Sequence, residues 1–169
     1  MRLSTDLAPL AWRMSPFSLY ARAFLAYCIH EHQEGFVRRI DVWLQPRSFT
    51  AQDDGRGMGL HREGYVTNLM GTLCGGPGAI QLHGIGLSIV AASSPSLAIE
   101  ARRDGKLWRQ SFAWGIADGP PRSEPAGPDT GTRITVALPA EAADIDAADV
   151  IAQVEVWRKM YAGLTIVVH

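Results

Sequence analysis

Cysteine is scarce in this sequence, which holds only Cys28 and Cys74 among its 169 residues. So small a number supports neither a disulfide framework nor a Cys-x-x-Cys metal motif. We therefore expect both cysteines to be reduced thiols, as is usual in the cytoplasm.

Long apolar runs and an excess of charge of either sign are also missing. No stretch is long enough to cross a bilayer, and no N-terminal stretch combines the basic, apolar and cleavage regions of a secretory signal. With 16 Lys and Arg against 17 Asp and Glu, the formal net charge is −1. Such a balance provides no strong field for a membrane or a nucleic acid. The sequence predicts a cytoplasmic protein with no membrane partner and no direct nucleic-acid binding, so a DNA-related role would have to come from a larger assembly.

Hydrophobic residues are plentiful, at 47% of the sequence, and predict a globular core. The length suits a single domain, which we place over residues 1–169. Residues 1–14 show no firm period and are expected to form an arm. The glycine-rich segment within 71–82 is expected to be a loop.

Hydrophobic periods and turn residues predict an α+β fold. Ser15 can cap a first helix over 15–35, and Gly35 can end it. The residues expected on the buried face of that helix are Leu19, Ala23, Ala26, Tyr27 and His30. Asp146 is the expected cap of the last helix, and Asp104 and Gly105 form a hairpin turn.

The remaining elements follow from the same patterns. They are strands over 38–46, 48–52, 131–139 and 164–169, helices over 62–73, 83–94 and 144–163, a hairpin over 96–115, and a loop over 116–129. The last strand is apolar enough to lie in the interior of the sheet. Because there is no regular βαβ alternation, we expect a mixed, mostly antiparallel sheet with helices on one face.

The stretch QDDGRGMG, at 52–59, follows an expected strand. An acidic turn of this kind is common and needs no function. Alternatively, one Asp at the strand end accepts a hydrogen bond from a ligand amine, and Gly55 and Gly57 let a flat ring approach the backbone. A metal site would need His61 and Glu63 as further ligands, and their spacing is not that of a metal motif.

Two further stretches are weak signals when taken alone. HGIGLSIV, at 83–90, opens a helix with glycines, so free backbone N–H groups and the helix dipole favour an anion such as a phosphate. The same glycines equally suit a close helix–strand contact, and no Gly-Lys-Ser/Thr or complete Gly-x-Gly-x-x-Gly pattern occurs. DTGTRITV, at 129–136, begins a strand with Thr132, whose hydroxyl can meet a buried ligand or satisfy a turn.

In this order and spacing, the three stretches resemble the GHKL (Bergerat-fold) ATP-binding domains, and most of all the ATPase domain of the DNA gyrase B protein of type IIA topoisomerases. The resemblance is strongest over 40–136 and is carried by QDDGRG, LHGIGLSIVAASS, DGKLWRQSFAWG and DTGTRITVALP. It implies the two-layer α/β sandwich of that fold and ATP and Mg²⁺ as cofactors. If the chain is an enzyme, the resemblance implies an ATP hydrolase.

The resemblance assigns an adenine pocket to particular residues. Asp53 would accept a hydrogen bond from the adenine amino group, with Thr132 in support, directly or through a water. Gly57 and Met58 would line the ring, and Arg56 would lie along its edge. Asp54, by contrast, is expected to support the turn.

The resemblance also implies how the phosphates are held. The residues expected to place backbone amides around them are His83, Gly84, Ile85 and Gly86. Arg109 matches an arginine at the pocket rim. Residues 71–82 would form an ATP lid that is shorter than in gyrase.

The N-terminal helix departs from the family pattern. The family carries there a Glu that activates the attacking water and, one turn later, an Asn that holds Mg²⁺. With RRIDV as the anchor for the register, the Glu position falls at or near Tyr27 and the Asn position at Glu31. A phenol cannot act as a general base at neutral pH without a large pKa shift, whereas Glu31 could bind Mg²⁺. A shifted register would let Glu31 or Glu34 orient the water, and both residues also fit a solvated helix end.

Three functions stand open at this point. The first is a gyrase-B-like, Mg²⁺-dependent ATP-binding domain whose hydrolysis is weak or absent. In gyrase-like enzymes the next domain supplies a lysine to the terminal phosphate and dimerisation orders the lid, and neither contribution is evident in this sequence. Dimerisation or a larger topoisomerase-like assembly would fit it. The second is a degenerate nucleotide-binding or interaction module that regulates without catalysis, which the altered YCIHEHQEG segment favours. The third, a histidine-kinase-type domain, lacks a preceding dimerisation helix with a phospho-acceptor His.

Overall fold

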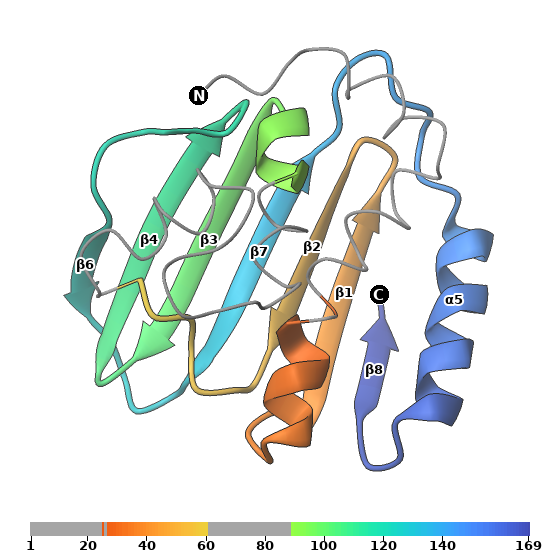
Figure 1. Cartoon of the computed structure of the whole chain (residues 1–169), viewed down its shortest axis with the longest axis horizontal. Helices are drawn as coiled ribbons and strands as arrows, with labels where there is room; N and C mark the ends of the chain where they lie inside the picture. The colour runs from red at the N-terminus through yellow and green to blue at the C-terminus, as the bar shows by residue number, and fades with distance from the viewer. Residues whose placement is uncertain (1–24, 26, 61–88) are drawn as a thin grey trace.

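The computed structural model describes residues 25, 27–60 and 89–169. These residues form a mixed sheet with helical segments packed on it (Figure 1). The expected arm over 1–14, helix over 62–73 and lid over 71–82 lie outside the described residues, as do the four expected phosphate-binding residues His83 to Gly86.

The sheet has eight strands and the order β5-β4-β3-β7-β2-β1-β8, with β6 also paired to β4. The strands are β1 (Arg39–Gln45), β2 (Ser48–Asp53), β3 (Ser96–Arg103), β4 (Lys106–Ala113), β5 (Ile116–Ala117), β6 (Arg122–Pro125), β7 (Gly131–Ala137) and β8 (Thr165–Val168). Among the described strands, only β1 and β8 pair in parallel. The expectation of a mostly antiparallel sheet is therefore confirmed.

Strict alternation of side chains gives the sheet one apolar face. Ile40 and Val42 of β1 are buried, while Arg39 and Asp41 point to the other side. Buried residues of the neighbouring strands, Phe49, Ala51, Leu97, Ile99, Ile134, Val136 and Ile166, continue the same face. An alternating strand exposes one apolar row, so this face needs a second layer to cover it.

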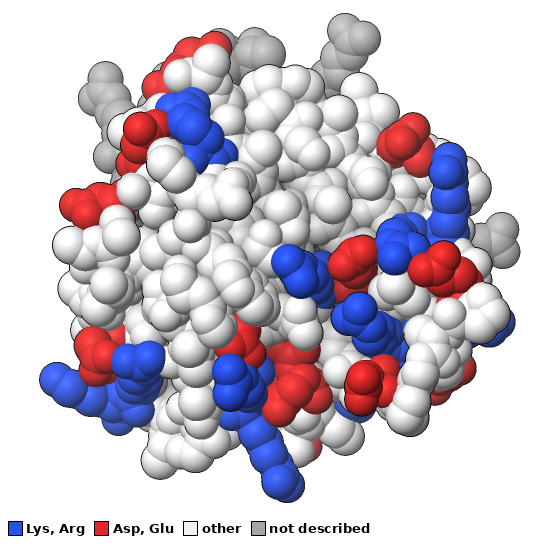
Figure 2. Space-filling model, turned by 180° about the vertical axis from the view of Figure 1, so that it is seen from behind, with Lys and Arg blue, Asp and Glu red and all other residues white. Residues whose placement is uncertain are grey.

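The opposite face of the sheet is polar. Figure 2 views the molecule from behind and shows basic and acidic side chains interleaved there. On this face Arg109 of β4 pairs with Glu100 of β3 and Glu124 of β6. Trp43 of β1 stacks on His169 at a ring separation of 4.8 Å.

The hairpin of β3 and β4 forms as its turn residues predict. Asp104 and Gly105 connect the strands with positive φ angles of 53° and 69°. Both angles are those of a type I′ turn, whose twist matches that of the strands and which favours Asp-Gly. This turn places Arg103, the last residue of β3, next to the start of the following strand.

Two expectations about strands are wrong. The segment 116–129, expected to be a loop, contains β5 and β6, both of which pair with β4. β6 is exposed along its whole length, so it has no apolar alternation to reveal it, and backbone pairing defines it. β8, expected in the interior, is an edge strand that pairs only with β1 among the described strands. Its apolar sequence still fits this position, because Ile166 lies on the buried face and the last helix packs against the strand.

The described part of the first helix covers residues 25 and 27–33. It ends at Gly35 as expected, where Phe36 N–H donates to Glu31 C=O at 2.8 Å and Gly35 N–H donates to His32 C=O at 2.9 Å. This pair of bonds is a Schellman motif. The most buried positions are Leu25 and Cys28, however, and Tyr27 and His30 are only partly buried. The apolar face is thus rotated from the one that the sequence predicts.

The last helix, α5 (Ala147–Met160), begins at Asp146, whose carboxylate accepts from Ala148 N–H at 2.9 Å. Its buried residues are Val150, Val154 and Trp157. Figure 1 shows α5 beside β8 and the helical segments 27–33 and 89–93 in front of the central strands. The two-layer α+β sandwich expected from the sequence is confirmed.

Candidate functional site

The end of β2 and the start of β7 meet at Asp53. Its side chain is only 2% exposed. Asp53 Oδ1 accepts from Gly55 N–H at 2.8 Å and from Thr132 N–H at 3.1 Å. Two backbone donors, one from the turn after β2 and one from β7, thus hold the carboxylate in one orientation.

Glycine is required where the two strands approach each other. Gly131 has a φ of 141°, and a Cβ built on it would overlap the backbone oxygen of Asp53. A residue with a side chain would therefore push β7 away from Asp53. The Gly-Thr pair of the DTGTRITV stretch places Thr132 against this carboxylate.

Burial raises the pKa of Asp53 to about 6, against the opposing effect of its N–H and S–H donors. The negative charge of Glu31 adds to the rise. A buried carboxyl whose ionised form is penalised is unusual in a purely structural role and is frequent at binding and catalytic sites. Asp53 is therefore the strongest functional candidate among the described residues.

Thr132 links Asp53 to the first helix. The Thr132 hydroxyl oxygen accepts from Met58 N–H at 3.0 Å and lies 3.4 Å from the Tyr27 hydroxyl. Burial, and then the charge of Asp53, raise the pKa of Tyr27 far above its usual value. Tyr27 is therefore a neutral phenol at neutral pH, and it cannot serve as a general base.

The next residue of the helix, Cys28, contacts Asp53 itself. Its side chain is fully buried, and its S–H donates to Asp53 Oδ2 at 3.5 Å. Burial and the neighbouring carboxylate raise the pKa of Cys28, so the thiol keeps its proton. Consecutive residues of one helix thus reach the hydroxyl of Thr132 and the carboxylate of Asp53.

Glu31 is held by Arg56 in a two-pronged ion pair. Arg56 Nε donates to Glu31 Oε2 at 2.9 Å and Nη2 donates to Oε1 at 2.7 Å. The guanidinium also lies 3.7 Å from the centre of the Phe36 ring. Glu31 is 7% exposed, and both of its oxygens accept from Arg56. The ion pair thus places a carboxylate and a guanidinium side by side in the site.

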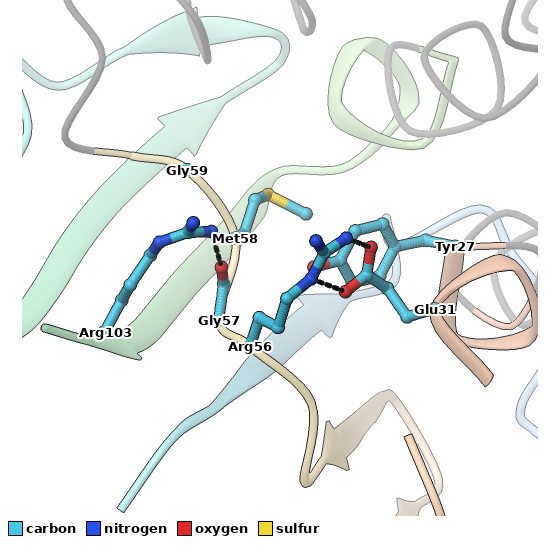
Figure 3. A pocket seen from close by; sticks show the side chains of 7 residues that line it. All are labelled: Tyr27, Glu31, Arg56, Gly57, Met58, Gly59 and Arg103. Carbon is cyan, nitrogen blue, oxygen red and sulfur yellow. Dashed lines mark hydrogen bonds and ion pairs between the residues drawn. The ribbon is translucent and has the colours of Figure 1, made fainter. Parts of the chain in front are cut away.

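A cavity of about 180 Å³ opens in front of these residues. Its lining consists of Tyr27, Glu31, Arg56, Gly57, Met58, Gly59 and Arg103. Figure 3 shows Arg56 and Arg103 on opposite sides of the Gly57–Met58 backbone, with Tyr27 behind the ion pair. Tyr27 and Met58 of the lining contact the Thr132 hydroxyl, and the backbone N–H of Thr132 donates to Asp53, so Asp53 lies one residue behind the lining. The described lining therefore combines backbone, one neutral phenol, the carboxylate of Glu31 and two guanidinium groups, one of which is paired with that carboxylate.

Arg103 is a residue that sequence reasoning missed. Its Nη1 donates to Gly57 C=O at 3.1 Å, and it lines the cavity. It shares the inner face of β3 with Ile99 and Ala101 by alternation, and that pattern could have identified it. Arg109, expected at the pocket rim, lies on the outer face of the sheet in ion pairs with Glu100 and Glu124.

The other predicted residues fall into two groups. The structure brings Glu31, Asp53, Arg56, Gly57, Met58 and Thr132 together. Asp54 instead supports the turn, because its Oδ1 accepts from the backbone N–H groups of Arg38 and Arg39 at 2.8 and 2.9 Å. His83, Gly84, Ile85 and Gly86 remain outside the described residues.

The structure offers no cluster of His, Cys, Asp and Glu that could hold a metal ion, within the residues that it describes. Its described helices include none with the length and apolar character needed to cross a membrane.

The sequence is similar to the B proteins of bacterial type II topoisomerases. It is 35% identical to the DNA gyrase B protein of Borreliella burgdorferi over 121 residues, which are 63% of this chain and 19% of that protein. It is 34% identical to the type 2 topoisomerase B protein of Aquifex aeolicus over 101 residues, or 52% of this chain and 13% of that protein. Identity to the DNA topoisomerase 4 B protein of Streptococcus pneumoniae is 37% over 97 residues, or 50% and 15%.

The fold is similar to that of a solved ATPase domain. The 43K ATPase domain of Thermus thermophilus gyrase B, crystallised with an aminocoumarin, matches with a TM-score of 0.76 and 28% identity. The match covers 90% of this chain and 42% of that one. No protein-family model matches the sequence. The chain thus spans less than a fifth of the curated relatives and under half of the solved domain.

Proposed function

We propose that the chain binds ATP in the cavity lined by Tyr27, Met58 and Arg103, because its sequence and fold are similar to those of gyrase B and of a gyrase B ATPase domain. One observation carries the proposal. Thr132, which contacts the lining residues Tyr27 and Met58, also donates to a buried carboxylate with a raised pKa, and two arginines flank the cavity. Such a site suits a ligand with a hydrogen-bond donor at one end and negative charge at the other.

Asp53 would recognise the adenine ring. An ionised carboxylate has about four acceptor positions, and those on Oδ2 meet only the weak S–H donor of Cys28 among the described residues. The exocyclic amino group of adenine can donate there. Guanine carries a carbonyl oxygen at the equivalent ring position, and this oxygen would repel the carboxylate. We therefore expect the site to prefer ATP over GTP.

The remaining lining residues suit the rest of a nucleotide. Gly57 and Met58 would lie along the ring, while Arg56 and Arg103 would face its edge and the phosphates. In this proposal Arg103 takes the place at the rim that the sequence suggested for Arg109. The backbone amides at 83–86 remain the proposed phosphate contacts, together with a lid over 71–82.

Hydrolysis by the isolated chain would be weak or absent. Tyr27 is neutral and Glu31 is bound to Arg56 through both oxygens, so neither is poised to activate water. For the same reason, the described residues do not by themselves fit a Mg²⁺ site. Any Mg²⁺ dependence would come through the phosphates, which bind the ion readily. This arrangement also favours the second candidate, a nucleotide-responsive regulatory module without catalysis.

Calorimetric titration with ATP, ADP, GTP and a non-hydrolysable ATP analogue, with and without Mg²⁺, tests the proposal. We expect ATP to bind at least about tenfold more tightly than GTP. Phosphate release measured on the same samples separates the ATPase from the regulatory module. No binding of ATP or its analogue by the intact chain would reject the proposed function.

Arg103 and Arg109 provide a matched pair of variants. Arg103→Ala should lower ATP affinity about tenfold, because it removes a charged donor from the cavity. Arg109→Ala, on the far side of the same hairpin, should leave the affinity within about twofold. The reverse result would return the rim position to Arg109.

The relatives are much longer than this chain, and their names describe the B proteins of gyrase and topoisomerases. A role within a larger topoisomerase-like assembly, or a dimer, is therefore part of the proposal. Co-purification of the tagged chain, followed by light scattering with and without ATP, would test it.

A further inference from the structure

Cys28 occupies a position that the proposed function does not yet use. It is fully buried on the first helix, and its S–H points to Asp53 Oδ2 at 3.5 Å. A buried cysteine is most often a small apolar residue that fills space. This one instead meets the one carboxylate oxygen that the described backbone leaves without a donor.

The contacts of Asp53 divide cleanly between its two oxygens. Oδ1 receives the backbone N–H groups of Gly55 and Thr132, which hold that side of the carboxylate. Oδ2 receives Cys28 alone among the described residues. The thiol therefore completes the support of the carboxylate from the side of the helix.

We propose that Cys28 is a positioning residue for Asp53, whose S–H holds Oδ2 and favours the ionised, hydrogen-bond-accepting form of the carboxylate. The inference rests on the proposed function, in which that form of Asp53 accepts the amino group of the base. A weak donor suits the role, because the carboxylate keeps a lone pair for the ligand and the thiol is easily displaced or shared. A stronger donor would compete with the ligand.

The other groups near Asp53 do not replace this contribution. On the helix, Tyr27 is a neutral phenol and Glu31 carries a negative charge that acts against ionisation of Asp53. Arg56 is bound to Glu31, and on β7 the contact is made by the uncharged Thr132. Asp54 lies on the turn and accepts from the backbone of Arg38 and Arg39. Cys28 is the described side chain whose hydrogen bond favours the charged form of Asp53.

The test compares four versions of the intact chain: wild type, Cys28→Val, Cys28→Ala and Cys28→Ser. Val is apolar and larger than Cys by about one methyl group, Ala is smaller and also has no donor, and Ser keeps a donor. The pH titration of the Asp53 side-chain carbon, followed by carbon-13 NMR without ligand, reports the pKa of Asp53. We expect Cys28→Val and Cys28→Ala to raise that pKa by about 0.5 to 1, and Cys28→Ser to stay nearer the wild type.

Affinity for ATP gives a second measurement. If Cys28 only filled space, its substitution would not change this affinity in a pH-dependent way. With the higher pKa, the ionised fraction of Asp53 falls about threefold near pH 6 and hardly changes at pH 8. Cys28→Val should therefore bind ATP about threefold more weakly at pH 6 and within about twofold of the wild type at pH 8. An equal loss at both pH values would indicate a packing defect and overturn the proposal.

Infrared spectroscopy tests the hydrogen bond without changing Cys28. In a Cys74→Ser background one thiol remains, and its S–H stretching band should move to higher frequency in Asp53→Asn. An unmoved band, or an unchanged pKa of Asp53 in both Cys28→Val and Cys28→Ala, would overturn the proposal. Failure of the wild type to bind ATP at pH 8 would reject the proposed function instead, while the titration of Asp53 would still report on Cys28.

Discussion

Asp53 is a group whose charge opposes folding. Burial raises its pKa to about 6, whereas an Asp in an unfolded chain titrates near ~3.9. The folded state therefore holds the proton more tightly, so Asp53 stabilises the fold below about pH 4 and this contribution is lost as the pH rises through 6. The loss amounts to roughly 3 kcal/mol above pH 6. A cost of this size is typical of a residue kept for binding rather than for stability.

Asp53→Asn should consequently stabilise the protein while it weakens ligand binding. Asn can still accept from the N–H groups of Gly55 and Thr132, and it carries no charge to bury. We expect the free energy of unfolding in urea to rise by about 1–3 kcal/mol at pH 8 and to change little at pH 4. ATP affinity at pH 8 should fall at least about tenfold, because the amide cannot offer a charged acceptor.

Asp54→Asn is the matched control for that experiment. Its carboxylate is exposed and accepts from two backbone N–H groups at the start of β1. It should be neutral or slightly destabilising at pH 8, without a gain in stability. A loss of stability in Asp53→Asn at pH 8 would contradict the assignment of a buried, penalised charge.

The elements that frame the site depend on turn and cap residues. The β2–β7 pair can close on Asp53 only because Gly131 adopts a φ of 141° and carries no Cβ. The first helix ends at Gly35 and presents Tyr27, Cys28 and Glu31 to the site from one side. Residues that fix the backbone, such as Gly35 and Gly131, therefore determine where the side chains of the site lie.

Gly131→Ala should move β7 and loosen the site. We expect a loss of more than about 1 kcal/mol in the free energy of unfolding, because the substitution is incompatible with the native φ. Gly127→Ala, where an added Cβ meets nothing within 4 Å, should stay within about 0.5 kcal/mol of the wild type. Equal effects of the two substitutions, measured by urea denaturation, would contradict the close approach at Gly131.

Helix α5 tests the capping chemistry separately from the site. Asp146→Ala should lower the free energy of unfolding by about 1 kcal/mol, because Ala148 N–H loses its acceptor. Asp146→Ser, which keeps an oxygen at the cap, should retain most of the stability. Affinity for ATP should not change in either variant, since α5 lies beside β8 at the far edge from the hairpin.

The whole molecule is a sheet with two different faces. One face is apolar, packs against helical segments and ends at the cavity lined by Tyr27, Arg56 and Arg103. The other is polar, with cross-strand ion pairs that include Arg109. The proposed ligand site and the surface charge are thus separated by one layer of backbone.

Binding of ATP should stabilise this molecule by mass action. At a free ATP concentration about one hundred times the dissociation constant, the free energy of unfolding should rise by about 2.7 kcal/mol. Scanning calorimetry with increasing ATP measures the effect as a rise in the melting temperature. A rise as large in Asp53→Asn as in the wild type, or no rise in the wild type, would contradict binding at this site.

Local features of the chain followed from sequence alone. Hydrophobic periods and turn residues predicted the strands β1, β2 and β7, and the turn and cap residues Asp104, Gly105 and Asp146 were identified correctly. The motif order also indicated the fold that the comparison with the solved gyrase B domain confirms. These features depend on neighbours within a few residues, so a single sequence contains the information.

Contacts between distant segments needed the tertiary structure. The exposed β6 and the edge position of β8 result from backbone pairing, which leaves little trace in side-chain pattern. The ion pair of Glu31 and Arg56, the position of Arg103 rather than Arg109 at the cavity and the thiol of Cys28 on Asp53 also arise only when elements pack. The sequence could identify Asp53 as a candidate, because its motif is local. Its raised pKa and its partners come from burial between a helix and two strands that are far apart along the chain.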